Sequence, residues 1–221
     1  MNTKCILFDI DGLMADSEQL TFTLIREILR ERGLDMTLDF YRQTIGVDQK
    51  IGARLFTDTY PGIDGQKDVY DVFETRYEAA VQEGRLSPKP GLFELLEELD
   101  RRNLRRAAAS SNVERVAMAN LRGIGALSRM DAVVCDGMVE HVKPFPDLFL
   151  KAAELLGAQP EECLVLEDST AGVQAARAAG IPVIVIPDLI SPTEETLEIC
   201  LARMDSLLDV RNFLVENDIR G

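Results

Sequence analysis

Two aspartates that directly follow a short apolar run carry the clearest chemical signal in the sequence. Asp9 and Asp11 come after the run that ends in Phe8, and Gly12 follows them. Residues two apart on a strand share a face, so both carboxylates start on one side and the turn at Gly12 can re-aim the second. One aspartate alone is as typical of a turn or a helix cap as of a catalytic site. The pair instead favours a metal-assisted reaction on an anion, in which one carboxylate attacks or binds metal and the other moves protons.

Three later places in the sequence also carry polar residues beside apolar runs. Ser110 and Ser111 offer hydroxyl groups just before an expected helix, whose N-terminus stabilises a bound anion. Lys143 is stiffened by the proline after it and can meet a phosphoryl oxygen as a point charge. Glu167 and Asp168 end an apolar run and offer the carboxylate oxygens that Mg²⁺ prefers.

Each of these residues also has a simpler structural interpretation. Ser111 or Asn112 is a suitable N-cap for a helix that begins at Val113. Asp168 can cap the next helix, although a cap does not require the second acid beside it. A lysine in a loop is usually only solvated. His141 is the only histidine, and we assign it no role.

The alternation of apolar runs with helical segments predicts an α/β fold with a Rossmann-like parallel sheet. We expect strands over residues 4–9, 105–110, 131–135, 163–166 and 182–186, and helices over residues 92–102, 113–122, 146–156 and 171–179. Strands connected by helices form parallel sheets with right-handed crossovers, and ligands bind at the carboxyl ends of such strands. This rule brings the four polar places to one edge of the sheet.

The segment between the first strand and residue 86 has a different character. It contains amphipathic helical patterns from Ser17 to Gly33 and over residues 38–44, 48–57 and 68–83, and no strand-like run. The Pro-rich segment 87–91 favours a stiff connector. We therefore predict an α/β catalytic core of residues 1–15 and 87–221, with residues 16–86 inserted as an all-helical cap domain.

Composition narrows the class of protein. The chain has 221 residues and a formal net charge of −14, which argues against a nucleic-acid-binding surface. No signal peptide and no apolar run of ~18 residues is visible, so we expect no membrane association and a cytoplasmic monomer. The four cysteines form no CxxC pair and are expected to be free thiols.

The order of these motifs resembles that of the haloacid dehalogenase (HAD) superfamily. FDIDG comes first, followed by Ser110 after a strand, then Lys143-Pro144 and Glu167-Asp168-Ser169. More narrowly, the chain resembles the beta-phosphoglucomutase-like phosphatases, which have a helical cap inserted after the first motif. The resemblance implies a HAD-like core that hydrolyses a small phosphorylated metabolite, such as a sugar phosphate.

The same resemblance implies a role for each site residue. Asp9 would be the nucleophile that forms an aspartyl-phosphate, and Asp11 the general acid and base. Ser110 and Lys143 would hold the phosphoryl group. Mg²⁺ would be bound by Asp9, the Asp11 carbonyl and Asp168, with Glu167 close by or acting through water.

Three positions depart from the family pattern. Thr21 aligns with a histidine of the mutases, Gln49 aligns with an arginine that they use for the distal phosphate, and Val142 stands where relatives often have glycine. The first two departures favour a phosphatase over the alternative, a phosphomutase. A non-enzymatic regulator on the same fold is a third possibility, disfavoured because the acids and the lysine are intact.

Overall fold

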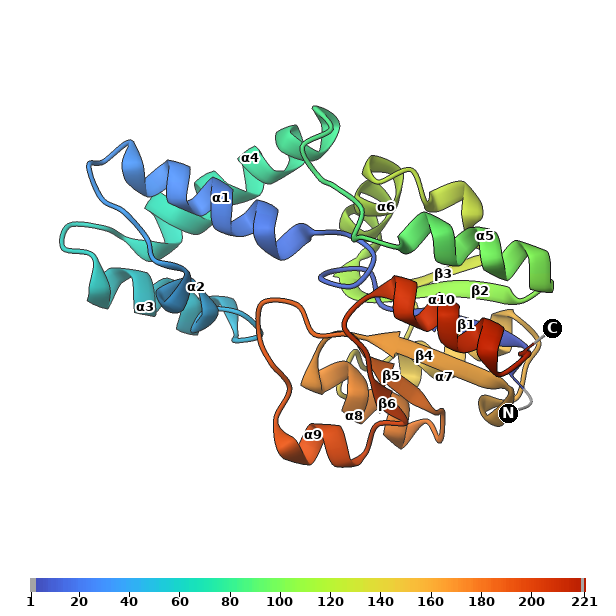
Figure 1. The fold of residues 1–221 in the computed structure, drawn as a ribbon. Helices are drawn as coiled ribbons and strands as arrows, with labels where there is room; N and C mark the ends of the chain where they lie inside the picture. The colour runs from blue at the N-terminus through green and yellow to red at the C-terminus, as the bar shows by residue number, and fades with distance from the viewer. Residues whose placement is uncertain (1–2, 220) are drawn as a thin grey trace. The chain divides into compact units, whose positions relative to one another are not determined.

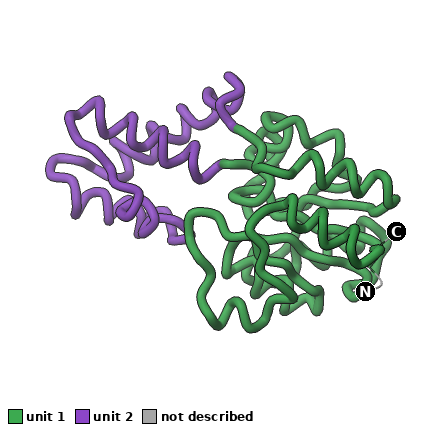
Figure 2. The backbone as a smooth tube through the Cα atoms, in the orientation of Figure 1, with its two compact units in different colours: residues 1–16, 87–221 green, residues 17–86 purple. Residues whose placement is uncertain are grey.

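The computed structural model describes residues 3–219 and 221, and it divides into two compact units. Figure 2 shows the first unit, formed by residues 1–16 and 87–221, and the second, Ser17–Leu86. The second unit is a single continuous stretch of chain, whereas the first is assembled from two stretches.

The first unit is built on a six-stranded parallel sheet (Figure 1), which confirms the predicted fold class. The sheet has the order β3-β2-β1-β4-β5-β6, so the first strand of the chain lies in the interior. Cys5 of β1 pairs with Arg105 on one side and with Cys163 on the other. The strands are β1 (Cys5–Phe8), β2 (Arg105–Val113), β3 (Ala132–Asp136), β4 (Cys163–Glu167), β5 (Val183–Val185) and β6 (Ala202–Arg203).

Helices cover both faces of this sheet, which explains why β1 is apolar at every position. Cys5 and Leu7 pack against α7 and α8, while Ile6 and Phe8 are fully buried on the other face. Helices α5 and α10 pack against each other. The helices are α5 (Leu92–Arg102), α6 (Glu114–Gly123), α7 (Asp147–Leu155), α8 (Thr170–Ala178), α9 (Glu194–Glu198) and α10 (Leu207–Glu216), with short 3₁₀ turns at Leu127–Arg129 and Pro160–Glu162.

The regular elements described in the second unit are all helical. Its elements are α1 (Ser17–Arg30), α2 (Leu38–Arg42), α3 (Gln49–Thr59), a π-helical turn η1 (Gly65–Tyr70) and α4 (Asp71–Gln82). Thr37 and Asp48 cap α2 and α3 by accepting backbone N–H bonds. The buried Phe56 ring contacts those of Phe40 and Tyr70, which gives the unit its own aromatic core.

The structure departs from the sequence prediction in three places. The helix expected over residues 68–83 is preceded by the turn η1, because Asp64 accepts backbone N–H bonds and starts the helical conformation earlier. Strand β2 continues to Val113, past a register shift, instead of ending at residue 110. The sequence predicts no element beyond residue 186, where the structure has α9, the two-residue β6 and α10.

The structure also bears on the cysteines and on membrane-spanning segments. All four cysteines are free, and Cys5, Cys135 and Cys163 are buried. Within the described residues, no helix has the length and apolar character needed to cross a membrane.

Candidate active site

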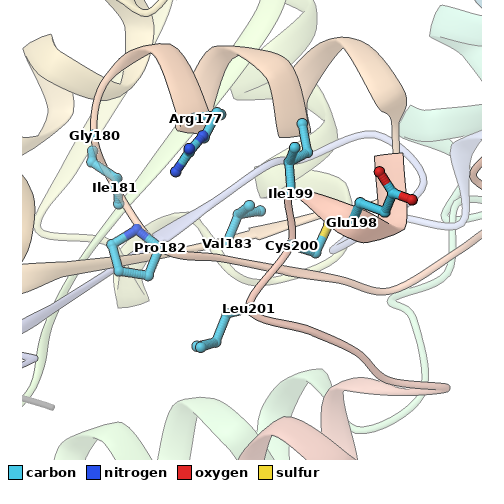
Figure 3. Close-up of a pocket in the computed structure, with 9 residues that line it drawn as sticks. All are labelled: Arg177, Gly180, Ile181, Pro182, Val183, Glu198, Ile199, Cys200 and Leu201. Carbon is cyan, nitrogen blue, oxygen red and sulfur yellow. The ribbon is translucent and has the colours of Figure 1, made fainter. Parts of the chain in front are cut away.

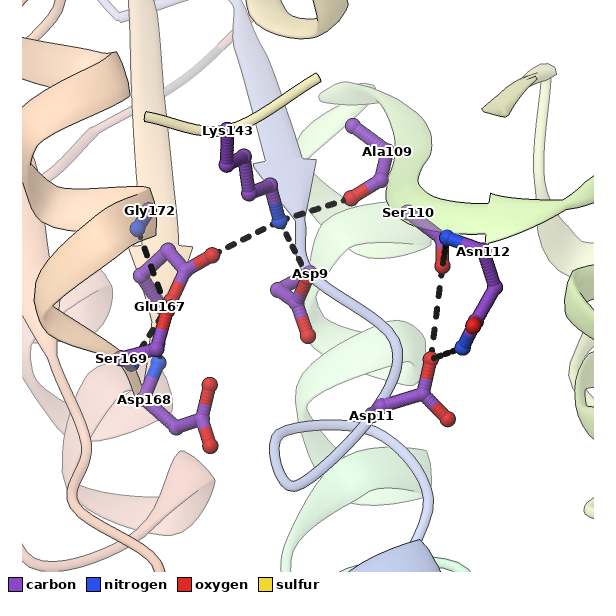
Figure 4. A network of polar contacts seen from close by, with 10 residues as sticks. All are labelled: Asp9, Asp11, Ala109, Ser110, Asn112, Lys143, Glu167, Asp168, Ser169 and Gly172. Carbon is purple, nitrogen blue, oxygen red and sulfur yellow. Dashed lines mark hydrogen bonds and ion pairs between the residues drawn. The ribbon is translucent and has the colours of Figure 1, made fainter. Parts of the chain in front are cut away.

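The structure brings the predicted polar residues together at the carboxyl edge of the sheet (Figure 4). Asp9 follows β1, Glu167 ends β4, and Lys143 enters from the loop between β3 and α7. Residues 9 and 167 come from neighbouring strands, since β1 pairs directly with β4. The parallel arrangement therefore explains how residues more than 130 positions apart in the chain come into contact.

Lys143 is a cation that contacts residues of three neighbouring segments of the sheet, at or just after β1, β2 and β4. Its ammonium group donates to Asp9 Oδ1, to the carbonyl of Ala109 at 2.9 Å and to Glu167 Oε1 at 2.7 Å. The Lys143 side chain is only 5 % exposed. Burial lowers the lysine pKa, but the charges of Asp9 and Glu167 outweigh it, so the pKa of Lys143 is raised and the ammonium stays charged.

Glu167 has both carboxylate oxygens occupied. Oε1 accepts from Lys143, while Oε2 accepts from the backbone N–H groups of Asp168 and Ser169 at 2.8 Å and from the Ser169 hydroxyl at 2.9 Å. Ser169 in turn caps α8 by accepting from Gly172 N at 3.1 Å. The cap is therefore Ser169 and not Asp168, whose carboxylate is left available for another role.

Gly172 is required by the space that Glu167 occupies. A Cβ atom at residue 172 would lie 1.7 Å from Glu167 Oε1. We expect Gly172→Ala to displace that carboxylate and to destabilise the fold by about 1–3 kcal/mol. Urea denaturation measures the loss of stability. The exposed Gln174→Ala on the same helix should stay within about 0.5 kcal/mol of the wild type. Equal stability of the two variants would contradict this prediction.

Asp9, Glu167 and Asp168 form a group whose composition suits a hard divalent cation. One ligand oxygen from each residue lies within 4.8 Å of the others. Asp9 Oδ2 and the Asp168 carboxylate accept no hydrogen bond from any described residue. Three carboxylates face a single lysine, so the group has an excess of negative charge and offers only oxygen ligands.

Burial also affects protonation in this group. It raises the pKa of Asp9 well above its usual range; Lys143 opposes this shift, and the Glu167 charge adds to it. Burial likewise raises the pKa of Asp168, and the charges of Glu167 and Asp9 act in the same direction. A bound cation would favour the ionised carboxylates, so the residues present fit such an ion.

Asp11 has a different environment from Asp9. Its Oδ2 accepts from Asn112 Nδ2 at 2.9 Å and from the Ser110 hydroxyl at 3.3 Å, and its Oδ1 accepts from Asn120 Nδ2 at 2.8 Å. Figure 4 shows Asp11 on the β2 side of the site, whereas Asp9 faces Lys143 and Glu167. The turn at Gly12 therefore separates two carboxylates that the alternation along a strand would place on the same face.

The asparagines around Asp11 are the main residues that the sequence interpretation missed. Asn112 is predicted only as a possible helix cap, but α6 begins after Val113 without a side-chain cap. Asn120 is fully buried on α6 beside the apolar Ala117 and Leu121, and a polar residue within an apolar stripe is the signal that could have identified it.

Two other residues of the prediction lie outside these contacts. Ser111 has an exposed side chain on β2, in contrast to the buried Ser110. His141 is exposed, with its ring 4.7 Å from that of Phe145.

A separate pocket of about 420 Å³ lies at the opposite edge of the sheet (Figure 3). Pro182 and Leu201, which precede β5 and β6, line it together with Arg177, Glu198 and Cys200. These are the amino ends of the strands, so the pocket is distinct from the carboxylate site.

Comparison with known proteins decides the family. The model of the haloacid dehalogenase-like hydrolases matches residues 6–186, a span that includes all the acids and the lysine described above. The chain belongs to that family. It is therefore a HAD-family hydrolase, and the resemblance noted from its motifs is confirmed.

Two relatives and one solved structure are similar to this chain over most of its length. It is 33% identical over 194 residues to the Arabidopsis thaliana protein SUPPRESSOR OF QUENCHING 1, chloroplastic, covering 85% of this chain but only 18% of that protein. It is 31% identical to a phosphorylated carbohydrates phosphatase of Thermotoga maritima, covering 80% and 82% of the two chains. A HAD family hydrolase from Deinococcus radiodurans R1, solved with bound phosphate and sodium, superposes with a TM-score of 0.84 at 26% identity, covering 98% and 97%.

Proposed function

We propose that this protein is a magnesium-dependent phosphatase that hydrolyses a small phosphate monoester, such as a sugar phosphate, through an aspartyl-phosphate. One observation carries the proposal: the two aspartates of the first motif have different partners. Asp9 contacts the lysine and lies in the carboxylate group, whereas Asp11 is held apart by amide and hydroxyl donors. Two carboxylates in different environments can take two different roles.

Asp9 is the nucleophile in this proposal. Its oxygen forms a bond to phosphorus while the bond between phosphorus and the ester oxygen breaks. Lys143, fixed by its contacts with Ala109 and Glu167, offsets the repulsion between the attacking carboxylate and the phosphate dianion. Ser110 is buried beside Asp11 and is proposed to donate to the phosphoryl group together with Lys143.

Asp11 handles the protons. In the first step its protonated form gives a proton to the departing ester oxygen, and the alcohol leaves. In the second step the Asp11 carboxylate takes a proton from water as the water attacks phosphorus. Inorganic phosphate is released and the Asp9 carboxylate is restored.

Magnesium fits the group described above. Asp9 and Asp168 are proposed to bind it, with Glu167 close by, and it would supply positive charge to the phosphoryl oxygens. The bound phosphate and sodium of the Deinococcus neighbour and the carbohydrate substrates in the Thermotoga relative's name support this combination of anion, cation and substrate class.

The direct test is phosphate release from a panel of sugar monophosphates, with and without Mg²⁺. We expect turnover of at least one sugar phosphate, its loss on chelation and its recovery when Mg²⁺ is restored. Full activity after exhaustive chelation would remove the metal from the proposal, and no release from any monoester would refute the phosphatase assignment.

A phosphomutase is the alternative function, and a related assay distinguishes it from a phosphatase. In the helical unit, the Thr21 hydroxyl donates to its own helix backbone at Ser17, and the Gln49 amide donates to Glu74. Neither residue supplies the positive charge that would hold a second phosphate strongly. With a hexose 1-phosphate and a trace of the bisphosphate, we expect phosphate to form faster than the isomerised sugar. The opposite order would favour the mutase.

The raised acid pKa values predict how stability depends on pH. In cation-free protein the pKa values of Asp9 and Asp168 lie above the value of about 3.9 for an unfolded aspartate, so the folded state binds more protons. These two groups should therefore contribute more to the free energy of unfolding as the pH is lowered from about 8 towards 4. Thermal unfolding across that range should show a weaker pH dependence with Mg²⁺, or in Asp168→Asn, than in the chelated wild type. Identical pH dependence in all three samples would contradict the prediction.

A further inference from the structure

Asp188 is a further acidic residue at the carboxyl edge of the sheet, and the proposed reaction leaves it without a role. It lies three residues after the end of β5, and its side chain is only 7 % exposed. Asp188 Oδ1 accepts from Lys89 Nζ at 2.6 Å, but the buried Oδ2 has no hydrogen-bond partner among the described residues. An unpaired buried carboxylate oxygen is costly, so a missing donor is expected there.

The position of Gly12 shows where this oxygen lies. A Cβ atom on Gly12 would be 3.2 Å from Asp188 Oδ2 and 2.2 Å from Asp168 Oδ2. The two carboxylate oxygens therefore border the same small space, which the glycine leaves open. The Asp188 charge also contributes to raising the pKa of Asp168, after burial and the charges of Glu167 and Asp9.

Asp188 is nevertheless not part of the group whose oxygens lie mutually within 4.8 Å, which is Asp9, Glu167 and Asp168. It is therefore placed beyond direct coordination by an ion bound there. Mg²⁺ keeps several water ligands in proteins, and each such water has hydrogens to donate outward. A carboxylate oxygen beside Asp168 with no donor of its own matches that geometry.

We propose that Asp188 accepts a hydrogen bond from a water molecule on the cation held by Asp9 and Asp168, and so strengthens cation binding. The inference rests on the cation site of the proposed function. Asp188 is in this sense a positioning residue, and it forms no bond to the ion or to substrate. Sequence signal for it exists, because the strand-end rule that selects Glu167 also selects the end of β5.

Lys89 holds Asp188 in place. Its backbone N–H donates to the Met14 carbonyl at 2.9 Å, and its ammonium also contacts Asp16 at 3.4 Å. Asp16 is more exposed than Asp188, with 33% of its side chain accessible. Asp16→Asn is therefore a matched control, since it removes a carboxylate charge from the same lysine without removing the oxygen beside Asp168.

The test is calorimetric titration of Mg²⁺ into metal-free protein, which measures binding without turnover. We expect Asp188→Asn to weaken cation affinity by roughly 10- to 100-fold, the usual effect of losing a partner of a metal-bound group. Asp16→Asn should match the wild type, and Asp168→Asn should lose most binding. Equal affinities for Asp188→Asn and Asp16→Asn would overturn the proposal.

Two further outcomes keep the result decisive. If Asp188→Asn unfolds because Lys89 loses the closer of its two charge partners, the double variant Lys89→Gln/Asp188→Asn removes both charges together. It should fold and still bind Mg²⁺ weakly, and wild-type affinity in it would refute the role of Asp188. If the wild type binds no Mg²⁺ at all, the cation site of the proposed function fails as well. Loss of affinity confined to the Asp188 variants leaves that site intact.

Discussion

Asp9→Asn should abolish phosphatase activity, lowering turnover by several orders of magnitude while the fold is retained. The substitution keeps the side-chain volume but removes the carboxylate that attacks phosphorus. It also removes one of the three acids proposed to surround the cation. Glu167 still pairs with Lys143 in the variant, so the lysine is not left buried and unpaired.

Steady-state phosphate release measures this effect, and circular dichroism verifies the fold. Asp58→Asn, at an exposed position of the helical unit, serves as the control and should behave as wild type. Retention of more than a few per cent of wild-type activity in Asp9→Asn would show that another group is the nucleophile.

Asp11→Asn should separate two classes of substrate. An alkyl phosphate has a poor leaving group that needs a proton, so its hydrolysis should fall by orders of magnitude. The aryl oxide of an activated aryl phosphate leaves without that proton, so formation of the aspartyl-phosphate should be much less affected. Pre-steady-state release of the aryl alcohol measures this first step directly.

The control for Asp11→Asn is a substitution away from the site. Asp58→Asn removes an exposed carboxylate of the helical unit and should hydrolyse both substrates as the wild type does. Equal losses of Asp11→Asn on both substrates would show that Asp11 is not the acid.

The residues at the ends of the strands could be predicted because their position follows from simple rules. A run such as the one ending at Phe8, apolar on both faces, is typical of a strand inside a parallel sheet, and the polar residue after such a strand lies at the carboxyl edge. Asp9, Lys143 and Glu167 follow from that rule, and the structure places them in contact.

The remaining contacts depend on features that no short sequence window contains. Asn120 reaches Asp11 from within a helix, and only the packing of α6 shows which face points towards the site. The open side of Asp188 depends on Gly12, nearly 180 residues earlier in the chain. β6 has two residues, too few to show a period.

The division of the chain also has a consequence for how the protein is made on the ribosome. The helical unit is complete once residue 86 has been synthesised, whereas β1 cannot form its ladder with β4 until residue 163 and those after it emerge. The apolar segment Cys5–Phe8 can pair with β2 earlier, but it lacks its β4 partner through most of translation. Such long-range pairing is slow and leaves hydrophobic segments open to aggregation. We expect nascent chains that stop short of β4 to depend on chaperones, and chains that include it to become resistant to protease.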